Sequence, residues 1–151
     1  MDEILRTGGK NGTKRNTLVD ERGVPLSIVA TGANRYDISQ REAVLENIVL
    51  KRPDTEQHLC ADKGYQGIPA LLIILSQGYI PHVKQRNEEV QEKRDNPHYK
   101  ARRWIVEASH SWFNRFRKIL VRFEKLNERY EVLLHMAAAI IALRKAGFIY
   151  E

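Results

Sequence analysis

The pattern of apolar and polar positions near the start of the chain predicts a β-hairpin. Lys14–Val19 and Leu26–Thr31 have the composition of strands, and the segment 20–25 between them contains the Asp, Gly and Pro residues of a turn. The preceding residues 1–13 are polar and rich in glycine, so we expect a flexible lead-in.

Beyond the hairpin, apolar segments alternate between the helical and the extended pattern, with glycine and proline residues near their ends. The predicted elements are a helix from about Gln40 to Val49, a buried strand at His58–Ala61, a helix from about Ile68 to Gln77 that Gly78 closes, and a strand at Tyr79–Val83. The polar segment Lys84–Tyr99 predicts a loop or a loose helix.

Two long helices are predicted in the last third of the chain, from about Lys100 to Phe123 and from about Glu128 to Lys145. The first helix has an apolar stripe at three- and four-residue spacing. This stripe consists of Trp104, Ile105, Ala108, Trp112, Phe116, Ile119 and Leu120. We expect both of its tryptophans to lie in the core. The polar stripe consists of Arg103, Glu107, His110, Asn114 and Arg117.

This order of elements indicates an α/β fold with a mixed sheet. The 151 residues suffice for one domain with its own core. The N-terminus lacks the pattern of a signal peptide, and the longest apolar runs, Ile68–Leu75 and Met136–Leu143, are too short to span a bilayer. We therefore expect a cytoplasmic protein.

The charge of the chain narrows the choice of partner. The formal net charge is +6 and the pI is about 9.5, with basic residues concentrated in the second half. This balance favours a polyanionic partner such as nucleic acid. The single cysteine, Cys60, excludes an internal disulfide and a cysteine-based zinc site. Because Cys60 lies in an apolar strand, we expect a buried thiol.

Two acidic residues lie where a catalytic metal site could form. Asp62 directly follows the strand His58–Ala61, and α/β folds place functional groups at the carboxyl ends of strands. Its carboxylate could bind a hard cation such as Mg²⁺, although capping of the next turn is an equally weighted alternative. Glu107 lies on the long helix among arginines, where the plain alternative is an ion pair with Arg103.

The same helix carries cations that we expect to contact DNA phosphates through a sequence-independent, salt-sensitive attraction. The candidate DNA-binding residues are Arg102, Arg103, His110, Asn114, Arg115, Arg117, Lys118 and Arg122. Two further acids have structural explanations, because Asp20 has the position of a turn residue and Asp37 that of a helix cap.

Several motifs together give the chain a resemblance to bacterial insertion-sequence transposases of the DDE type. They are Gly12–Arg15, Leu18–Asp20, Gly23–Leu26, Gly32–Asp37, Ala61–Tyr65, Ala101–Glu107 and Ser111–Lys118. Each motif alone is weak, but their order and spacing cover nearly the whole chain, which makes the resemblance specific.

The resemblance implies a ribonuclease-H-like fold, which is a mixed sheet with flanking helices. It also implies an enzyme that cuts and joins DNA with two divalent ions, Mg²⁺ or Mn²⁺. By resemblance, Asp62 is the second catalytic aspartate and Glu107 is the catalytic glutamate, and both are metal ligands. The implied partners are double-stranded DNA, as element ends and target, and the second subunit of a homodimer assembled on that DNA.

The chain departs from the family pattern at the first catalytic aspartate. In the family this residue lies upstream of the segment matching Gly8-Gly9, and Asp2 is too near the start to lie inside a preceding strand. We therefore expect residues 14–151 to be a partial catalytic domain without its first strand, inactive or nearly so alone. The expected partner is an N-terminal polypeptide from a first reading frame; otherwise the chain is a remnant. Ala108 stands where the family usually has an arginine. The strand Lys14–Val19 would have one unpaired edge, so we expect the isolated chain to dimerise or aggregate through it.

Three other hypotheses stay open. A non-catalytic DNA-binding fragment that interferes with a full-length transposase needs no metal at Asp62 and Glu107. A stand-alone nuclease requires a third acid, for which Asp20 and Asp37 are the candidates. The plainest hypothesis is a basic α/β domain without a role on DNA.

Overall fold

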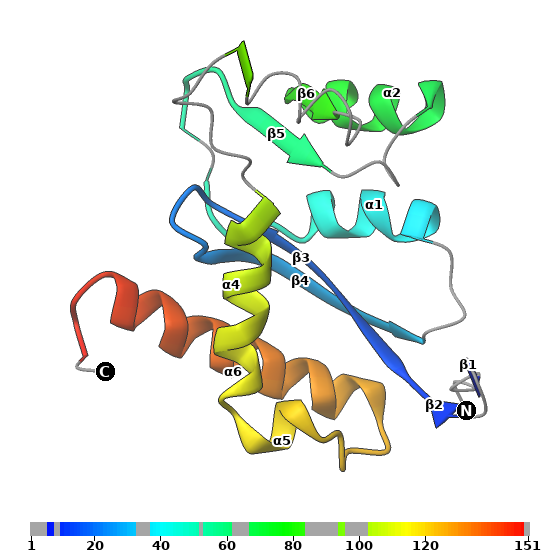
Figure 1. Ribbon diagram of the computed structural model, residues 1–151, viewed down its shortest axis with the longest axis vertical. Coiled ribbons are helices and arrows are strands. Elements are labelled where there is room, and N and C mark those ends of the chain that lie inside the picture. Colours follow the sequence, from blue (N-terminus) through cyan, green and yellow to red (C-terminus); the bar gives the residue numbers. More distant parts are fainter. Residues whose placement is uncertain are drawn as a thin grey trace.

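A computed structural model of the chain describes residues 6–7, 10–32, 37–51, 53–61, 67–83, 94–95 and 103–149. In chain order the elements are β1 (Arg6–Thr7), β2 (Lys10–Asn11), β3 (Thr13–Val19), β4 (Pro25–Gly32), α1 (Asp37–Glu46), β5 (His58–Ala61), α2 (Ile68–Ser76), β6 (Ile80–Val83), α4 (Arg103–Asn114), α5 (Arg117–Leu120) and α6 (Asn127–Lys145) (Figure 1). The predicted α/β class is confirmed. Among these helices, none is both long and apolar enough to cross a membrane.

The predicted hairpin is present as the antiparallel pair of β3 and β4, with a register from Thr13 opposite Gly32 to Val19 opposite Pro25. Asp20 is the turn residue that the sequence predicts, because its Oδ1 accepts hydrogen bonds from the N–H groups of Arg22 and Val24, each at 2.8 Å. Ahead of the hairpin, the predicted lead-in contains the short antiparallel pair of β1 and β2.

The second strand pair is parallel and joined by a helix. β5 and β6 lie in register from His58 opposite Ile80 to Ala61 opposite Val83, and α2 lies between them in the sequence. A parallel pair needs such a crossover connection. The described part of the chain contains both antiparallel and parallel strand pairs, but β3–β4 and β5–β6 form two separate two-stranded sheets there, not one mixed sheet.

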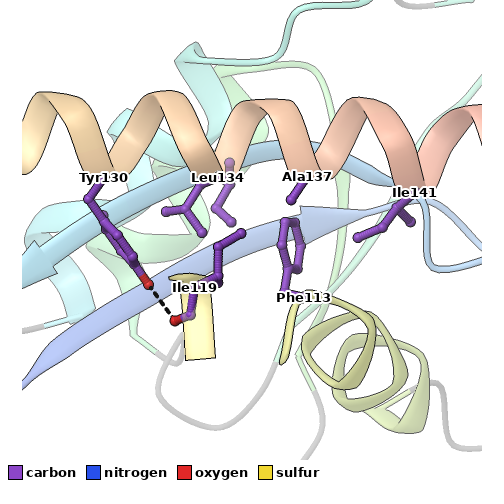
Figure 2. Packing of buried hydrophobic residues seen from close by; sticks show 8 residues of the cluster. Phe113, Ile119, Tyr130, Leu134, Ala137 and Ile141 are labelled. Carbon is purple, nitrogen blue, oxygen red and sulfur yellow. Dashed lines mark hydrogen bonds between the residues drawn. The ribbon is translucent and has the colours of Figure 1, made fainter. Parts of the chain in front are cut away.

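Two buried clusters hold the elements together. The first joins β4 to α4, α5 and α6, and Figure 2 shows its helical members. Its residues are Ile28, Ala30, Phe113, Ile119, Tyr130, Leu134, Ala137 and Ile141. The second joins α1, α2 and β5 and consists of Leu45, Leu59, Ile74 and Tyr79, with Leu18 of β3 packed against it. Since Leu18 pairs with Ser27 and Thr17 with Ile28, the two clusters lie on opposite faces of the hairpin.

The helix predicted over residues 100–123 is two helices, α4 and α5, so this prediction was wrong. Between them the chain makes a tight turn, in which the N–H groups of Arg115 and Phe116 bond to carbonyls three residues back at 3.2 and 3.1 Å. No glycine or proline marks this turn. Its effect is to bring Ile119 of α5 into the same buried cluster as Phe113 of α4.

The buried face of α4 also differs from the predicted one. Trp104, expected in the core, is 59% exposed, and Trp112 is only partly buried. The buried positions are Ile105, Ser109 and Phe113, at four-residue spacing. Because α4 has large apolar residues on two faces, its periodicity alone could not select the face that packs.

Alternation along β5 places its side chains in two environments. Leu59 is buried with α1 and α2, whereas His58 and Cys60 are exposed on the other face. The prediction of a buried thiol was therefore wrong, since an apolar strand can be covered on one face only. On the exposed face, Nδ1 of His58 lies 2.7 Å from Nε2 of His82 on β6.

Candidate metal and nucleic-acid site

Of the two candidate catalytic carboxylates, only Glu107 lies within the described residues. Asp62 lies outside the described residues, directly after Ala61, the last residue of β5. Glu107 lies in the first half of α4 with an exposed side chain. Ile105, two residues earlier, is buried, so this part of α4 is fixed to the core close to the exposed Glu107 side chain.

A cleft of about 550 Å³ borders the two residues before Glu107 and the first three residues of β5, but Ala61, which precedes Asp62, is not among its lining residues. Its walls include the end of β3, the residues His58–Cys60 of β5, and Ile105 and Val106 of α4. β5 and the residues that directly precede Glu107 therefore border one cavity, although they are far apart in the sequence.

The fit to a divalent metal is partial within the described residues. No three His, Cys, Asp or Glu side chains of this part of the chain come together as a metal site. The exposed carboxylate of Glu107 has the oxygen chemistry that Mg²⁺ prefers. The alternative was an ion pair between Glu107 and Arg103. The side chain of Arg103 is not among the described ones, so this alternative stays untested.

Asp20, one candidate for a third acid, is occupied by the hairpin turn. Its Oδ1 already accepts two backbone hydrogen bonds at 2.8 Å, as the sequence predicts for a turn residue. Asp37 begins α1, but its side chain lies outside the described residues.

Three of the predicted DNA-binding cations are grouped at the corner between α4 and α5. Arg115, Arg117 and Lys118 are all exposed there. Long cationic side chains at an exposed corner can neutralise phosphates without reaching bases. The side chains of Arg102 and Arg103, which belong to the same predicted surface, are not described.

Arg122 was predicted to bind DNA, yet much of its guanidinium is used within the protein. Its Nη1 donates to Oγ1 of Thr13 at 2.7 Å and its Nε donates to the carbonyl of Glu124 at 2.9 Å. The guanidinium carbon also lies 4.8 Å from the centre of the Tyr130 ring, a cation–π distance. These contacts join the start of β3 to α6.

Tyr130 completes this internal network from α6. Its hydroxyl donates to the carbonyl of Ile119 at 3.3 Å, as the dashed line in Figure 2 shows. Burial raises the pKa of the Tyr130 hydroxyl, and the positive charges of Arg15 and Arg122 oppose that rise. The phenol therefore remains neutral and acts as a structural donor.

Asn114 and His110 are linked to a residue that sequence reasoning missed. Arg15 of β3 donates from Nη2 to Oδ1 of Asn114 at 2.7 Å. His110 is partly buried, and burial followed by the charge of Arg15 lowers its pKa below the ordinary value of 6.5. His110 is therefore a neutral ring near pH 7, less suited to attracting phosphate than its charged form. Nothing in the local pattern of β3 marks Arg15 for this contact.

Trp112 packs on the hairpin turn. Gly23 there has a φ of +81°, and a Cβ added to it would lie 3.0 Å from Trp112 Cη2. The ammonium of Lys145 lies 4.1 Å from the centre of the Trp112 ring. Trp112 thus connects the turn, α4 and the end of α6, and it is not free to stack on a base.

Comparison with known proteins shows the family of the chain. A profile of the transposase DDE domain matches residues 59–144, more than half of the chain. The chain is also 27% identical over 147 residues to a protein assigned as a transposase for insertion sequence element IS402 of Burkholderia cepacia. That match covers 89% of this chain and 66% of the relative, just under two thirds of its length. No solved structure matches the chain. The profile spans β5 to α6 and includes both candidate carboxylates, and the chain belongs to the transposase DDE domain family.

Proposed function

We propose that this chain takes part in DNA transposition by contributing Asp62 and Glu107 to a divalent-metal site that cleaves and joins insertion-sequence DNA. The observation that carries this proposal is the shared cleft. His58–Cys60 of β5, the strand that ends directly before Asp62, and Ile105 and Val106, the two residues before Glu107, line the same cavity. Family membership supplies the class of chemistry, and the cleft supplies a reason for these two carboxylates to act together.

The donor chemistry suits Mg²⁺ or Mn²⁺, since carboxylate oxygens are the ligands that these ions prefer. A bound ion would supply Lewis-acid polarisation of a phosphoryl oxygen. The chain's own contribution is to hold and position the ion through Asp62 and Glu107. The exposed cations Arg115, Arg117 and Lys118 would bind the phosphates of double-stranded DNA beside the site.

We propose further that the isolated chain binds DNA but cleaves it poorly. The resemblance calls for three carboxylates, and this chain offers two by residue match. The missing aspartate would come from a first-frame N-terminal polypeptide, with a homodimer assembling on the element ends.

The test is nicking of DNA that carries the element ends, in Mg²⁺ or Mn²⁺, by the chain with and without that N-terminal polypeptide. We expect cleavage only with the polypeptide present. Asp62→Ala and Glu107→Gln should each lower it by about a hundredfold or more, as expected for a group that stabilises the transition state. Glu128→Gln, at an exposed position of α6, is the matched control and should cleave normally. Full cleavage by Asp62→Ala would remove the proposed site.

The exposed corner formed by Arg115, Arg117 and Lys118 also supports a second candidate, a non-catalytic fragment that occupies DNA and interferes with a full-length transposase. Mn²⁺ binding separates the two functions, because interference needs no ion. Calorimetric titration with Mn²⁺ should give binding that Glu107→Gln weakens if the chain is catalytic. Unchanged DNA binding together with no metal binding would favour interference.

A further inference from the structure

Two histidines meet on the exposed face of the β5–β6 pair. Cys60 of β5 pairs with His82 of β6, and His58 lies two residues before Cys60, so these three residues share one face of the parallel ladder. Both imidazoles are exposed, whereas Leu59, between His58 and Cys60, is buried on the opposite face. The two rings are therefore fixed on neighbouring strands and are open to solvent.

The contact between the two rings is made by nitrogen atoms. Nδ1 of His58 lies 2.7 Å from Nε2 of His82. The ring centroids are 4.9 Å apart and the ring planes are tilted by 40°, so the rings meet through their nitrogen-bearing edges and are not stacked face to face. As a hydrogen bond, this contact requires a proton on one of the two nitrogens and a bare lone pair on the other.

Two imidazole nitrogens this close can also bind one metal ion between them. Neutral imidazole is a common ligand of Zn²⁺, Ni²⁺ and Cu²⁺, whereas Mg²⁺ prefers oxygen. Zn–N bonds of about 2.0–2.1 Å place two nitrogens on the same ion about 2.9–3.4 Å apart. The separation of 2.7 Å between His58 and His82 is slightly shorter, and rotation of two exposed side chains can supply the difference.

We propose that Nδ1 of His58 and Nε2 of His82 bind one divalent transition-metal ion of the Zn²⁺ class, at a different place from the carboxylates of Asp62 and Glu107. Within the described residues, no third His, Cys, Asp or Glu side chain joins the pair as a ligand, so water completes the coordination. The proposal rests on the geometry of the two rings, and neither on DNA binding nor on family membership.

The bound ion connects β5 to β6 through side chains. In the described part of the chain, β5 pairs with β6 alone, and β5 ends directly before Asp62. Two-stranded sheets are only marginally stable by themselves, so a metal link between the strands stabilises this pair. The ion thereby holds in place the strand that leads into the proposed catalytic aspartate.

The first test is calorimetric titration of the whole chain with Zn²⁺ in excess Mg²⁺, which competes for oxygen ligands. His58→Gln and His82→Gln should each weaken Zn²⁺ binding by about tenfold or more, since loss of even an outer-shell partner costs roughly that much. His135→Gln is the matched control, because His135 is an exposed histidine of α6, and it should bind Zn²⁺ as the wild type does. Cys60→Ser should also keep the wild-type affinity.

A second measurement uses the unchanged protein, so it does not depend on the folding of a variant. The nitrogen NMR resonances of Nδ1 of His58 and Nε2 of His82 should shift together when Zn²⁺ is added, and Mg²⁺ alone should shift neither. Zn²⁺ should also slow amide exchange in β5 and β6, because the ion binds the folded strand pair.

Equal Zn²⁺ affinity in the wild type and in both histidine variants would overturn the proposal and leave the contact as a hydrogen bond between imidazoles. Loss of binding in Cys60→Ser would overturn it as well, by assigning the ion to the thiolate. Neither assay contains DNA. A negative result in both, alongside normal Mg²⁺-dependent cleavage, would remove the imidazole site and leave the proposed function intact.

Discussion

At the scale of single residues, Gly23 lies where the hairpin turn packs against Trp112 and Ile105 of α4. Its φ of +81° disfavours side chains, and an added Cβ would lie 3.0 Å from Trp112 Cη2. We expect Gly23→Ala to lower the free energy of unfolding by about 2–4 kcal/mol, from the left-handed backbone and from overpacking together. Chemical denaturation measures this change.

The matched control is Gly147→Ala. Gly147 has a similar φ of +77°, but nothing lies within 4 Å of its added Cβ. The loss there should be limited to the backbone cost of about 1–2 kcal/mol. Equal losses in the two variants would show that Trp112 yields to the new methyl group.

His110 makes stability depend on pH in a direction that its burial determines. Burial, and then Arg15, lowers its pKa in the folded state below 6.5, so the unfolded state binds more protons as the pH falls through that value. The stabilisation present above about pH 6.5 is thus lost progressively at lower pH. We expect His110→Gln to flatten this dependence between about pH 7 and 5. Parallel curves for the two proteins, from denaturation at each pH, would contradict the assignment.

At the scale of elements, the sequence predicts what local residues determine. The hairpin follows from turn chemistry at Asp20, and α2 ends at Ser76, shortly before Gly78, whose φ of 72° suits the position just after a helix. The break between α4 and α5 has no such marker. It results from Ile119 joining the cluster around Phe113, a tertiary contact that periodicity along one helix does not contain.

The candidate site also has one part that the sequence predicts and another that it does not. Arg115, Arg117 and Lys118 are exposed as the sequence predicts, because a charged corner needs no partner to be recognised. Arg122 looks identical in the sequence, but it binds Thr13, 109 positions earlier. Partners at that separation are determined by the packing of α6 on β4, which no local pattern encodes.

Arg122 therefore connects the start of β3 to α6. We expect Arg122→Ala to lower the free energy of unfolding by about 1–3 kcal/mol, since it removes hydrogen bonds from a charged donor and a contact with the Tyr130 ring. Arg117→Ala, at an exposed site, should change it by less than about 0.5 kcal/mol. Thermal unfolding of both variants tests this, and similar melting temperatures would mean that the Arg122 contacts add little.

At the scale of the whole molecule, the net charge of +6 and the exposed α4–α5 corner together predict how the proposed DNA binding responds to salt. Each neutralised phosphate contributes about 0.9 to the slope of log K against log salt concentration. Removing Arg115, Arg117 and Lys118 together should therefore reduce the slope by about 2.7, whatever the DNA sequence. Fluorescence anisotropy at several salt concentrations measures both slope and affinity.

Arg129→Ala separates a local surface from net charge, because Arg129 is an exposed cation on α6, away from the α4–α5 corner in the sequence. If the corner binds phosphate, this variant keeps the wild-type slope despite its altered charge. A loss of slope in proportion to the number of cations removed, wherever they lie, would instead make binding a property of overall charge. In that case α4 and α5 would have no defined position on DNA, and Glu107 could not be directed to a particular phosphate.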